Sequence, residues 1–305
     1  MYKSYTVEKD YSNSRFDKWF KTKIIDLPQS LIQKIIRLKK VKINKKKIKT
    51  SYRLQIGDKI EVFDISKFTP NNKKKVIKYK ASKKELNSYE DFIIENNDNF
   101  VVINKPAGIA VQSGTKSFRN IIDVLKDTKY FLNKTPYIVH RLDKETSGVM
   151  IVAKSREYAQ LFTSLFRIRK IHKTYIALTH GNISKNKLIL KDNLILFEKG
   201  RKIIQKAISN LRVIKSSDNY TYLELNPITG RKHQLRKQLF NLGNPIVGDD
   251  KYFQNSNSNR KIRKNNNLML HAYKIKFMIN NIQYNFKAPY NKHFENFLNK
   301  NFKSY

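Results

Sequence analysis

The apolar residues near the start of the chain recur at helical spacing. Within residues 14–38 they form two segments, which contain Phe16, Trp19, Phe20 and Ile24, and then Leu31, Ile35 and Leu38. Positions three or four apart lie on one face of a helix. We therefore predict two short amphipathic helices, the first capped by Ser14 and the second beginning at Pro28.

The apolar period then shortens to that of β-strands. We predict strands over residues 45–49 and 56–62, with a turn at Gly57–Asp58. The pattern disappears over residues 64–90, where a Thr-Pro-Asn-Asn turn is followed by many lysines without an apolar face. This composition predicts a flexible basic linker.

Strand patterns dominate the remainder of the chain. We predict strands over residues 92–95, 100–108, 137–139, 149–153, 173–178, 187–197, 207–214, 220–225 and 268–279. Helices are predicted after Ser117, after Ser155, at the Thr229–Gly230 turn and around residues 294–298. Residues 254–267, rich in Asn, Ser and Lys, are predicted to form a loop.

Length and composition limit the kinds of protein this can be. A chain of 305 residues can bury one large domain and a small one. It has no apolar run of membrane-spanning length, and its N-terminus lacks the core of a signal peptide, so we expect a cytoplasmic protein that does not bind membranes. Without cysteine there is no disulfide or thiolate metal site, and the six histidines lack metal-ligand spacing. We expect no metal.

The net charge of +39 favours a polyanionic partner. A composition rich in Lys, Asn and Ile also follows from AT-rich coding, so the charge alone does not identify nucleic acid as the partner. Arginines are more informative, because the guanidinium group binds carboxylates and phosphates through two parallel hydrogen bonds.

A polar loop between two predicted strands carries the first candidate chemistry. In this loop Arg141 and Asp143 are separated by one residue. A carboxylate held between basic groups stays ionised, so Asp143 is a candidate nucleophile or base. Taken alone, however, an Arg-x-Asp pair is more often a surface ion pair.

A second stretch, residues 227–236, leads from a strand through Thr229–Gly230 into a helix. Backbone N–H groups at a helix start and two arginines together favour anion binding. Arg231 and Arg236 are five residues apart and do not share one helical line, so we expect them to have different partners.

Four motifs together resemble one family, the large-subunit ribosomal RNA pseudouridine synthases. They are Asn-Lys-Pro-x-Gly (104–108), His-Arg-Leu-Asp-x-x-Thr-Ser-Gly (140–148), Lys-x-Tyr-x-Ala-Leu (173–178) and Thr-Gly-Arg-x-His-Gln-Leu-Arg (229–236), in the family's order. Gln112 stands where the family usually has His. The resemblance implies an α+β fold whose catalytic domain, residues 91–305, has a mixed, largely antiparallel sheet with peripheral helices.

Residues 14–63 resemble the S4 RNA-binding module. The similarity lies in Ser30-Leu31-Ile32, Val41-x-Ile43-Asn44 and Gly57-Asp58. It implies that Lys34, Arg37 and Lys39 contact RNA phosphates, which gives affinity rather than sequence choice. The alternative is a helix-hairpin packing domain with solvated lysines. Residues 64–90 then form the linker to the catalytic domain.

The family resemblance also implies the reaction, which is isomerisation of uridine to pseudouridine in 23S rRNA. Asp143 acts at the ribose, either as a nucleophile at C1′ or as a base, and Arg236 pairs with it. Arg141 fills the gap left by the flipped base, and Tyr175 packs beside the uracil and assists removal of the C5 proton. His233 is expected to be structural, and Arg231 to bind RNA. No cofactor is implied, and we expect a monomer.

Three alternatives remain open from the sequence. The chain can be a non-catalytic RNA-binding factor for ribosome assembly that keeps the fold. It can be a carboxylate-dependent hydrolase, for which Glu145 is the nearest second acid, although its place two residues beyond Asp143 is unfavourable. Its substrate can also be tRNA, although the S4 module favours rRNA.

Overall fold

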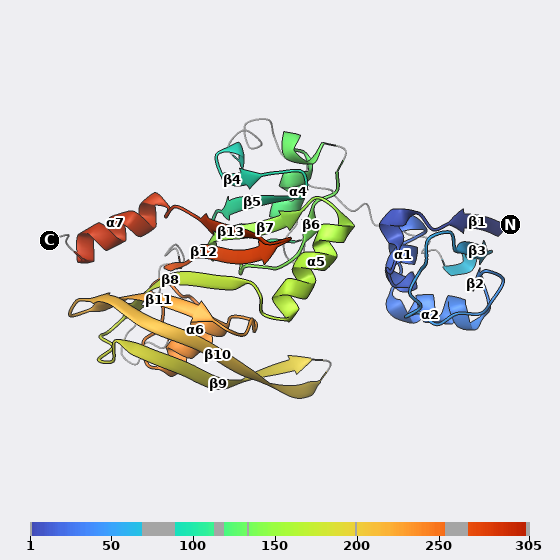
Figure 1. Ribbon diagram of the computed structural model, residues 1–305. Coiled ribbons are helices and arrows are strands. Elements are labelled where there is room, and N and C mark those ends of the chain that lie inside the picture. The colour runs from blue at the N-terminus through green and yellow to red at the C-terminus, as the bar shows by residue number, and fades with distance from the viewer. Residues whose placement is uncertain are drawn as a thin grey trace. The chain divides into compact units, whose positions relative to one another are not determined.

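The computed structural model describes residues 2–68, 89–112, 119–132, 134–198, 200–253 and 268–302. Residues 69–88 of the predicted linker, the predicted loop 254–267 and the predicted cap Ser117 lie outside these ranges. Contacts divide the chain into two units, residues 1–77 and 78–305 (Figure 1). Among the described residues no helix has the length and apolar character needed to span a membrane.

The first unit is built from the predicted aromatic helix face. It contains β1 (Tyr2–Thr6), η1 (Lys9–Tyr11), α1 (Phe16–Lys23), α2 (Gln29–Arg37), β2 (Val41–Ile43), β3 (Lys59–Phe63) and η2 (Ser66–Phe68). The strands form an antiparallel sheet in the order β1-β3-β2. Phe16, Trp19 and Phe20 of α1 are buried, which confirms the predicted aromatic face. The stripe predicted for the second helix is only partly right, because α2 buries Ile35 together with Ile32 and Ile36. Leu38 lies past the end of α2 and is 49% exposed.

Two further local predictions for this unit are wrong. The first helix begins at Phe16 without a side-chain cap, because carbonyls of Tyr52 and Thr50 accept its first N–H groups in place of Ser14. The strand predicted over residues 45–49 lies earlier, as β2, because the chain turns at Asn44 and Lys45, whose φ angles are 49° and 63°. The sequence reading also missed β1.

The second unit contains one large sheet. Its elements are β4 (Ile93–Asn96), β5 (Phe100–Lys105), α4 (Ile121–Lys126), η3 (Lys129–Phe131), β6 (Tyr137–Ile138), β7 (Ser147–Ala153), α5 (Arg156–Arg167), β8 (His172–His180), β9 (Lys187–Glu198), β10 (Arg201–Ser216), β11 (Tyr220–Pro227), α6 (Gln234–Asn241), β12 (Leu270–Ile279), β13 (Ile282–Lys287) and α7 (Lys292–Asn301). In the described residues the strand order is β4-β5-β7-β12-β8-β11-β10-β9, with β13 on β12 and β6 on β7. Asn120 caps α4, so the prediction of Ser117 as its cap is wrong. Helix α5 follows Ser155 as predicted, and Ser155 is its cap.

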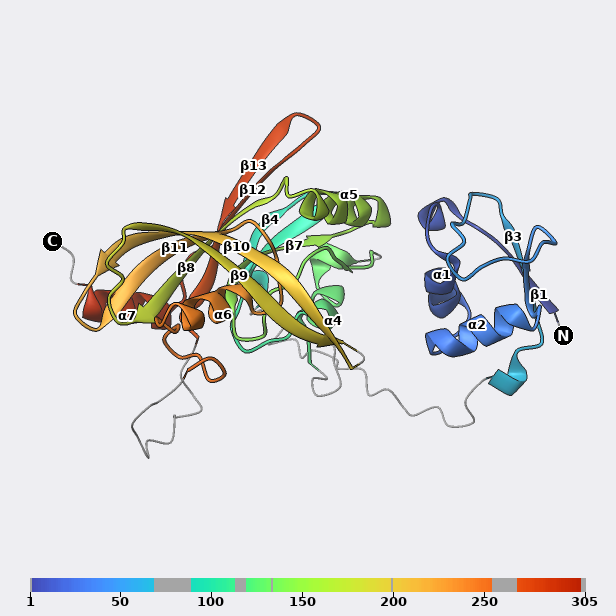
Figure 2. The ribbon, with the colours of Figure 1, turned by 90° about the horizontal axis from the view of Figure 1, so that it is seen from below.

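Helices cover both faces of the sheet around β5 and β7. Figure 2 shows α5 on one face and α4 on the other. Phe162 of α5 packs edge-on against Phe100 and Phe277, with ring centroids 5.3 Å apart in both pairs. All seven residues of β7 are buried, which agrees with a strand covered on both sides.

The contact between β7 and β12 is a seam that differs from the rest of the sheet. This pairing is parallel and joins Ser147 to His271 and Gly148 to Ala272, whereas the other strand pairs in the described residues are antiparallel. Ala272 also pairs with Tyr175 of β8, which pairs with Leu225 of β11. The loop before β7, the middle of β8 and the end of β11 therefore meet at one place.

Gly148 makes this seam possible. Its φ angle is +113°, and a Cβ atom built at this position overlaps the backbone of Ala272. Any larger residue must separate β7 from β12 or distort both strands.

We expect Gly148→Ala to destabilise the second unit by about 3 kcal/mol or more, because overlap adds to backbone strain. Gly243→Ala is the matched control, since Gly243 has a φ of +88° but open space around its Cβ position. Denaturant unfolding followed by circular dichroism measures the effect. Trp19, the one tryptophan, lies in the first unit, so its fluorescence transition should not change. Equal losses in the two glycine variants would contradict this account.

Candidate active site

A cleft of about 700 Å³ lies beside the seam. Its walls come from the loop between β6 and β7, the end of α5, the start of β8 and the segment that leads from β11 into α6. The predicted residues Arg141, Asp143, Tyr175, Arg231 and Arg236 all line this cleft. Residues from three separate sequence motifs thus face one cavity.

Two buried basic side chains hold the loop that carries Asp143. The Nε2 atom of His140 accepts the backbone N–H of Ile151 at 2.9 Å, and burial lowers the pKa of His140 to about 3, so the ring is neutral. The Lys105 amine donates to the carbonyls of Pro106, Ile109 and Lys144 at 2.7–3.1 Å. Burial lowers the pKa of Lys105 to about 7. The sequence reading assigned neither residue this supporting role.

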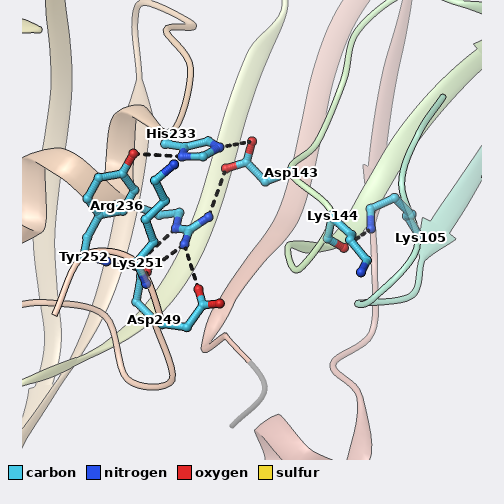
Figure 3. Close-up of polar contacts among 9 residues, drawn as sticks. Lys105, Asp143, Lys144, His233, Arg236, Asp249, Lys251 and Tyr252 are labelled. Atoms are coloured by element: carbon cyan, nitrogen blue, oxygen red, sulfur yellow. Dashed lines mark hydrogen bonds and ion pairs between the residues drawn. The ribbon is translucent and has the colours of Figure 1, made fainter. Parts of the chain in front are cut away.

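Arg236 lies between two carboxylates (Figure 3). Its Nε and Nη2 atoms donate to the two carboxylate oxygens of Asp249 at 2.7 and 2.6 Å, and its Nη1 atom lies 3.9 Å from Asp143 Oδ2. Burial raises the pKa of Asp249, but Arg236 and the backbone N–H groups of Lys251 and Tyr252 outweigh burial and hold the pKa below its usual value. Asp249 therefore remains a buried anion that fixes Arg236.

Asp249 was not among the predicted site residues. It lies in the sequence Gly-Asp-Asp-Lys-Tyr that follows the Thr-Gly-Arg motif, and its side chain is fully buried. In the sequence, Asp249 and Asp250 are adjacent and nothing distinguishes them. Only the fold shows that Asp249 is buried on Arg236 while Asp250 is exposed, with 75% of its side chain accessible.

His233 also faces the candidate catalytic carboxylate. Its Nε2 atom lies 3.7 Å from Asp143 Oδ1, and its Nδ1 atom lies 2.9 Å from the hydroxyl of Tyr252. His233 precedes α6 in a left-handed conformation with φ 53°. Figure 3 shows His233 and Arg236 approaching Asp143 from the same side.

Tyr175 and the two exposed arginines complete the cleft. Burial, together with the charge of Asp143, raises the pKa of Tyr175, so its hydroxyl stays protonated at neutral pH. Arg141 is exposed at the cleft, and Arg231 is exposed with its Nε atom donating to the Lys206 carbonyl at 3.1 Å. Arg231 and Arg236 have different partners, as predicted from their spacing.

The other predicted residues lie elsewhere. Lys34, Arg37 and Lys39 are exposed on and just after α2 in the first unit. Glu145 is not among the described residues that line the cleft, and it pairs with Lys144 at 3.7 Å. The structure therefore does not bring a second acid from this loop to Asp143, as the hydrolase alternative requires.

Comparisons with known proteins agree with this geometry. The sequence profile of the RNA pseudouridylate synthase family matches residues 99–241, and that of the S4 domain matches residues 15–60. The chain is 34% identical to "Ribosomal large subunit pseudouridine synthase C" of Buchnera aphidicola subsp. Schizaphis graminum, over 96% of this chain and 95% of the relative. It is 36% identical to the protein of the same name from Rickettsia conorii, over 79% of this chain and 82% of the relative.

A solved structure shows the same fold. Human RNA Pseudouridylate Synthase Domain Containing 4 is 27% identical, with a TM-score of 0.60 over 70% of this chain and 94% of the human chain. The chain belongs to the RNA pseudouridylate synthase family and carries an S4 domain. It is an RNA pseudouridine synthase, and the predicted α+β class with a mostly antiparallel sheet is confirmed.

We expect the Asp249 ion pair to give the second unit an acid-dependent stability. The folded pKa of Asp249 is lowered, so its contribution is complete above the unfolded value of about 4 and is lost as the pH falls through the folded value. Asp249→Asn should lower the free energy of unfolding at pH 7 by roughly 3 kcal/mol, because it leaves Arg236 buried without its partner. The difference from wild type should shrink below about pH 4.

Urea unfolding at a series of pH values measures this difference. Asp250→Asn is the matched control, because Asp250 is exposed and lies 3.5 Å from the same guanidinium. The account is wrong if Asp249→Asn and Asp250→Asn have the same stability profile.

Proposed function

We propose that this enzyme converts uridine to pseudouridine in 23S rRNA, with Asp143 as the carboxylate that acts at the ribose. The main observation is the position of Asp143 in the cleft, with Arg236 facing one oxygen and His233 the other. The substrate class is supported by relatives named for the large ribosomal subunit and by the S4 domain.

The reaction rearranges the bonds of one nucleotide and leaves its atomic composition unchanged. The bond from N1 of uracil to C1′ breaks, the base turns, and C5 bonds to C1′ while the C5 proton leaves and N1 gains a proton. The uridine must leave the stack for this chemistry, at a cost of a few kcal/mol. Because the product is an isomer of the substrate, the balance requires no oxidant, reductant or co-reactant.

Asp143 begins the cleavage, either as a nucleophile at C1′ or as a base at the ribose. Both roles need an ionised carboxylate. The guanidinium of Arg236 lies 3.9 Å from Asp143, and Asp249 keeps that guanidinium in place. Arg236 therefore acts on the orientation of Asp143.

Tyr175 is proposed to contact the flipped uracil, and Arg141 the RNA from which it is flipped. Tyr175 packs beside the uracil. Its phenol is protonated in the free enzyme, so for Tyr175 to take up the C5 proton its own proton has to leave at the same time. Arg141 is exposed at the rim and is proposed to occupy the gap left by the flipped base.

RNA is proposed to contact both units. Arg231 binds phosphate beside the cleft, and Lys34, Arg37 and Lys39 bind phosphates on the S4 module. The proposed divisions are residues 14–63 for this module, 64–90 for the linker and 91–305 for the catalytic domain. We propose that the protein acts as a cytoplasmic monomer.

Wild-type enzyme should form pseudouridine at defined positions in unmodified 23S rRNA, and Asp143→Asn should form none, because an amide has no negative charge to act at the ribose. Pseudouridine mapping by sequencing measures both, and a filter-binding assay checks that the variant still binds RNA. Glu145→Gln is the control and should keep the wild-type rate. Modification of tRNA alone would contradict the proposed substrate, and modification by Asp143→Asn would contradict the proposed role.

Neutralising the S4 cations should weaken RNA binding without changing the modified positions. For the triple variant Lys34→Gln, Arg37→Gln and Lys39→Gln, the slope of log affinity against log salt should fall by about 2–3, one counterion for each lost contact. Binding titrations at several salt concentrations measure this slope. The control triple, Lys3→Gln, Lys9→Gln and Lys18→Gln, removes equally exposed charges away from α2. Equal slopes in the two triples would refute a specific role for α2.

A further inference from the structure

Each oxygen of the Asp143 carboxylate faces a different nitrogen donor. Arg236 Nη1 lies 3.9 Å from Oδ2, and His233 Nε2 lies 3.7 Å from Oδ1. Both distances exceed a hydrogen bond, but catalytic hydrogen bonds often shorten only when substrate is bound. The arrangement is therefore a carboxylate poised between two donors.

The neighbours of His233 determine which of its ring nitrogens carries the proton. Burial lowers the pKa of His233, and the charges of Arg236, Lys251 and Lys232 lower it further against the opposing charge of Asp143, so the ring is neutral at neutral pH. A carboxylate only accepts hydrogen bonds, so the proton belongs on Nε2, towards Asp143. Nδ1 is then the acceptor for the Tyr252 hydroxyl at 2.9 Å.

Tyr252 is itself held by the ion pair that fixes Arg236. Its backbone N–H donates to Asp249 Oδ1 at 2.9 Å, and its ring lies against the Arg236 guanidinium, whose Cζ atom is 5.2 Å from the ring centroid. One buried carboxylate, Asp249, therefore positions Arg236 directly and His233 through Tyr252.

The backbone at His233 supports a specific role for this residue. A φ angle of 53° lies in the left-handed region, which is uncommon for residues other than glycine, although histidine, like asparagine and aspartate, is enriched there. It costs on the order of 1–2 kcal/mol. Such strain persists only where the surroundings impose it, and it gathers at functional sites. Here it turns the imidazole towards Asp143 at the start of α6.

We propose that His233 is a second positioning residue for Asp143, and that Tyr252 sets its tautomer. The proposal rests on the proposed role of Asp143 and differs from the sequence-based expectation that His233 is structural. His233 donates from Nε2 to Oδ1 of Asp143 while Arg236 donates to Oδ2, so the carboxylate is held against rotation as it meets the ribose.

Single-turnover rates with 23S rRNA test this role. His233→Leu should lower the single-turnover rate constant about tenfold to hundredfold, the usual effect of losing one hydrogen bond to a charged group, while the Kd for RNA stays unchanged. His233→Gln should recover most of the rate, because its amide N–H can occupy the position of Nε2–H. The double variant His233→Leu, Tyr252→Phe should be no slower than His233→Leu alone, since Tyr252 acts through His233.

Thermal unfolding of each variant separates positioning from folding. The proposal predicts that the leucine and glutamine variants have similar Tm values but different single-turnover rate constants. It is overturned if His233→Gln is as slow as His233→Leu, or if Tyr252→Phe multiplies the defect of His233→Leu.

A second measurement needs no RNA substrate, so it separates this proposal from the proposed function. The ¹⁵N NMR signals of His233, assigned by their loss in His233→Gln, report its tautomer in the free enzyme. We expect the Nε2–H form in wild type and a mixture in Tyr252→Phe. A wild-type signal from the Nδ1–H form overturns the proposal even if the enzyme modifies another RNA.

Discussion

The close approach of Gly148 to the backbone of Ala272 is the constraint on which the site depends. It allows β7 to run parallel to β12 while β12 pairs with β8. The loop that ends at Gly148 carries Asp143, and the partner of Ala272 on β8 is Tyr175. The packing of two backbones, rather than a contact between the two side chains, therefore brings the candidate acid and the candidate aromatic residue to the same cleft.

Electrostatics then determine how the carboxylate in that cleft is held. A buried charge is costly unless it is paired and hydrogen-bonded, and Asp249 has two bonds from Arg236 and two from backbone N–H groups. Asp249 accepts hydrogen bonds from Nε and Nη2 of Arg236. The third nitrogen, Nη1, faces Asp143 at 3.9 Å. The carboxylate of Asp143 is thus close to a positive charge without being locked into a short ion pair.

Sequence patterns predicted much of this protein, but not its long-range pairings. The helix face around Trp19 followed from local periodicity, and the sequence motifs identified Asp143, Tyr175 and Arg236 as candidate site residues. Tyr175 and Asp143 could be joined only through the register of β7, β12 and β8, which depends on residues about 100 positions further along the chain.

The incorrect local predictions also have causes that lie elsewhere in the chain. Ser14 matches a capping box, yet backbone carbonyls from residues 50 and 52 replace it, and nothing near residue 14 indicates that they will. Asp249 looks like its neighbour Asp250 in the sequence, and burial alone distinguishes them. The role of Tyr252 depends on Asp249 and His233 together, so no single motif reveals it.

The most direct test of the central claim follows the reaction rather than its product. Release of tritium from RNA labelled at C5 of uridine, under single-turnover conditions, reports the step in which the C5 proton leaves. The account predicts rapid release with wild type and release at background level with Asp143→Asn at saturating enzyme, since no step follows until the carboxylate acts at the ribose. Release by Asp143→Asn at the wild-type rate would show that another group starts the reaction.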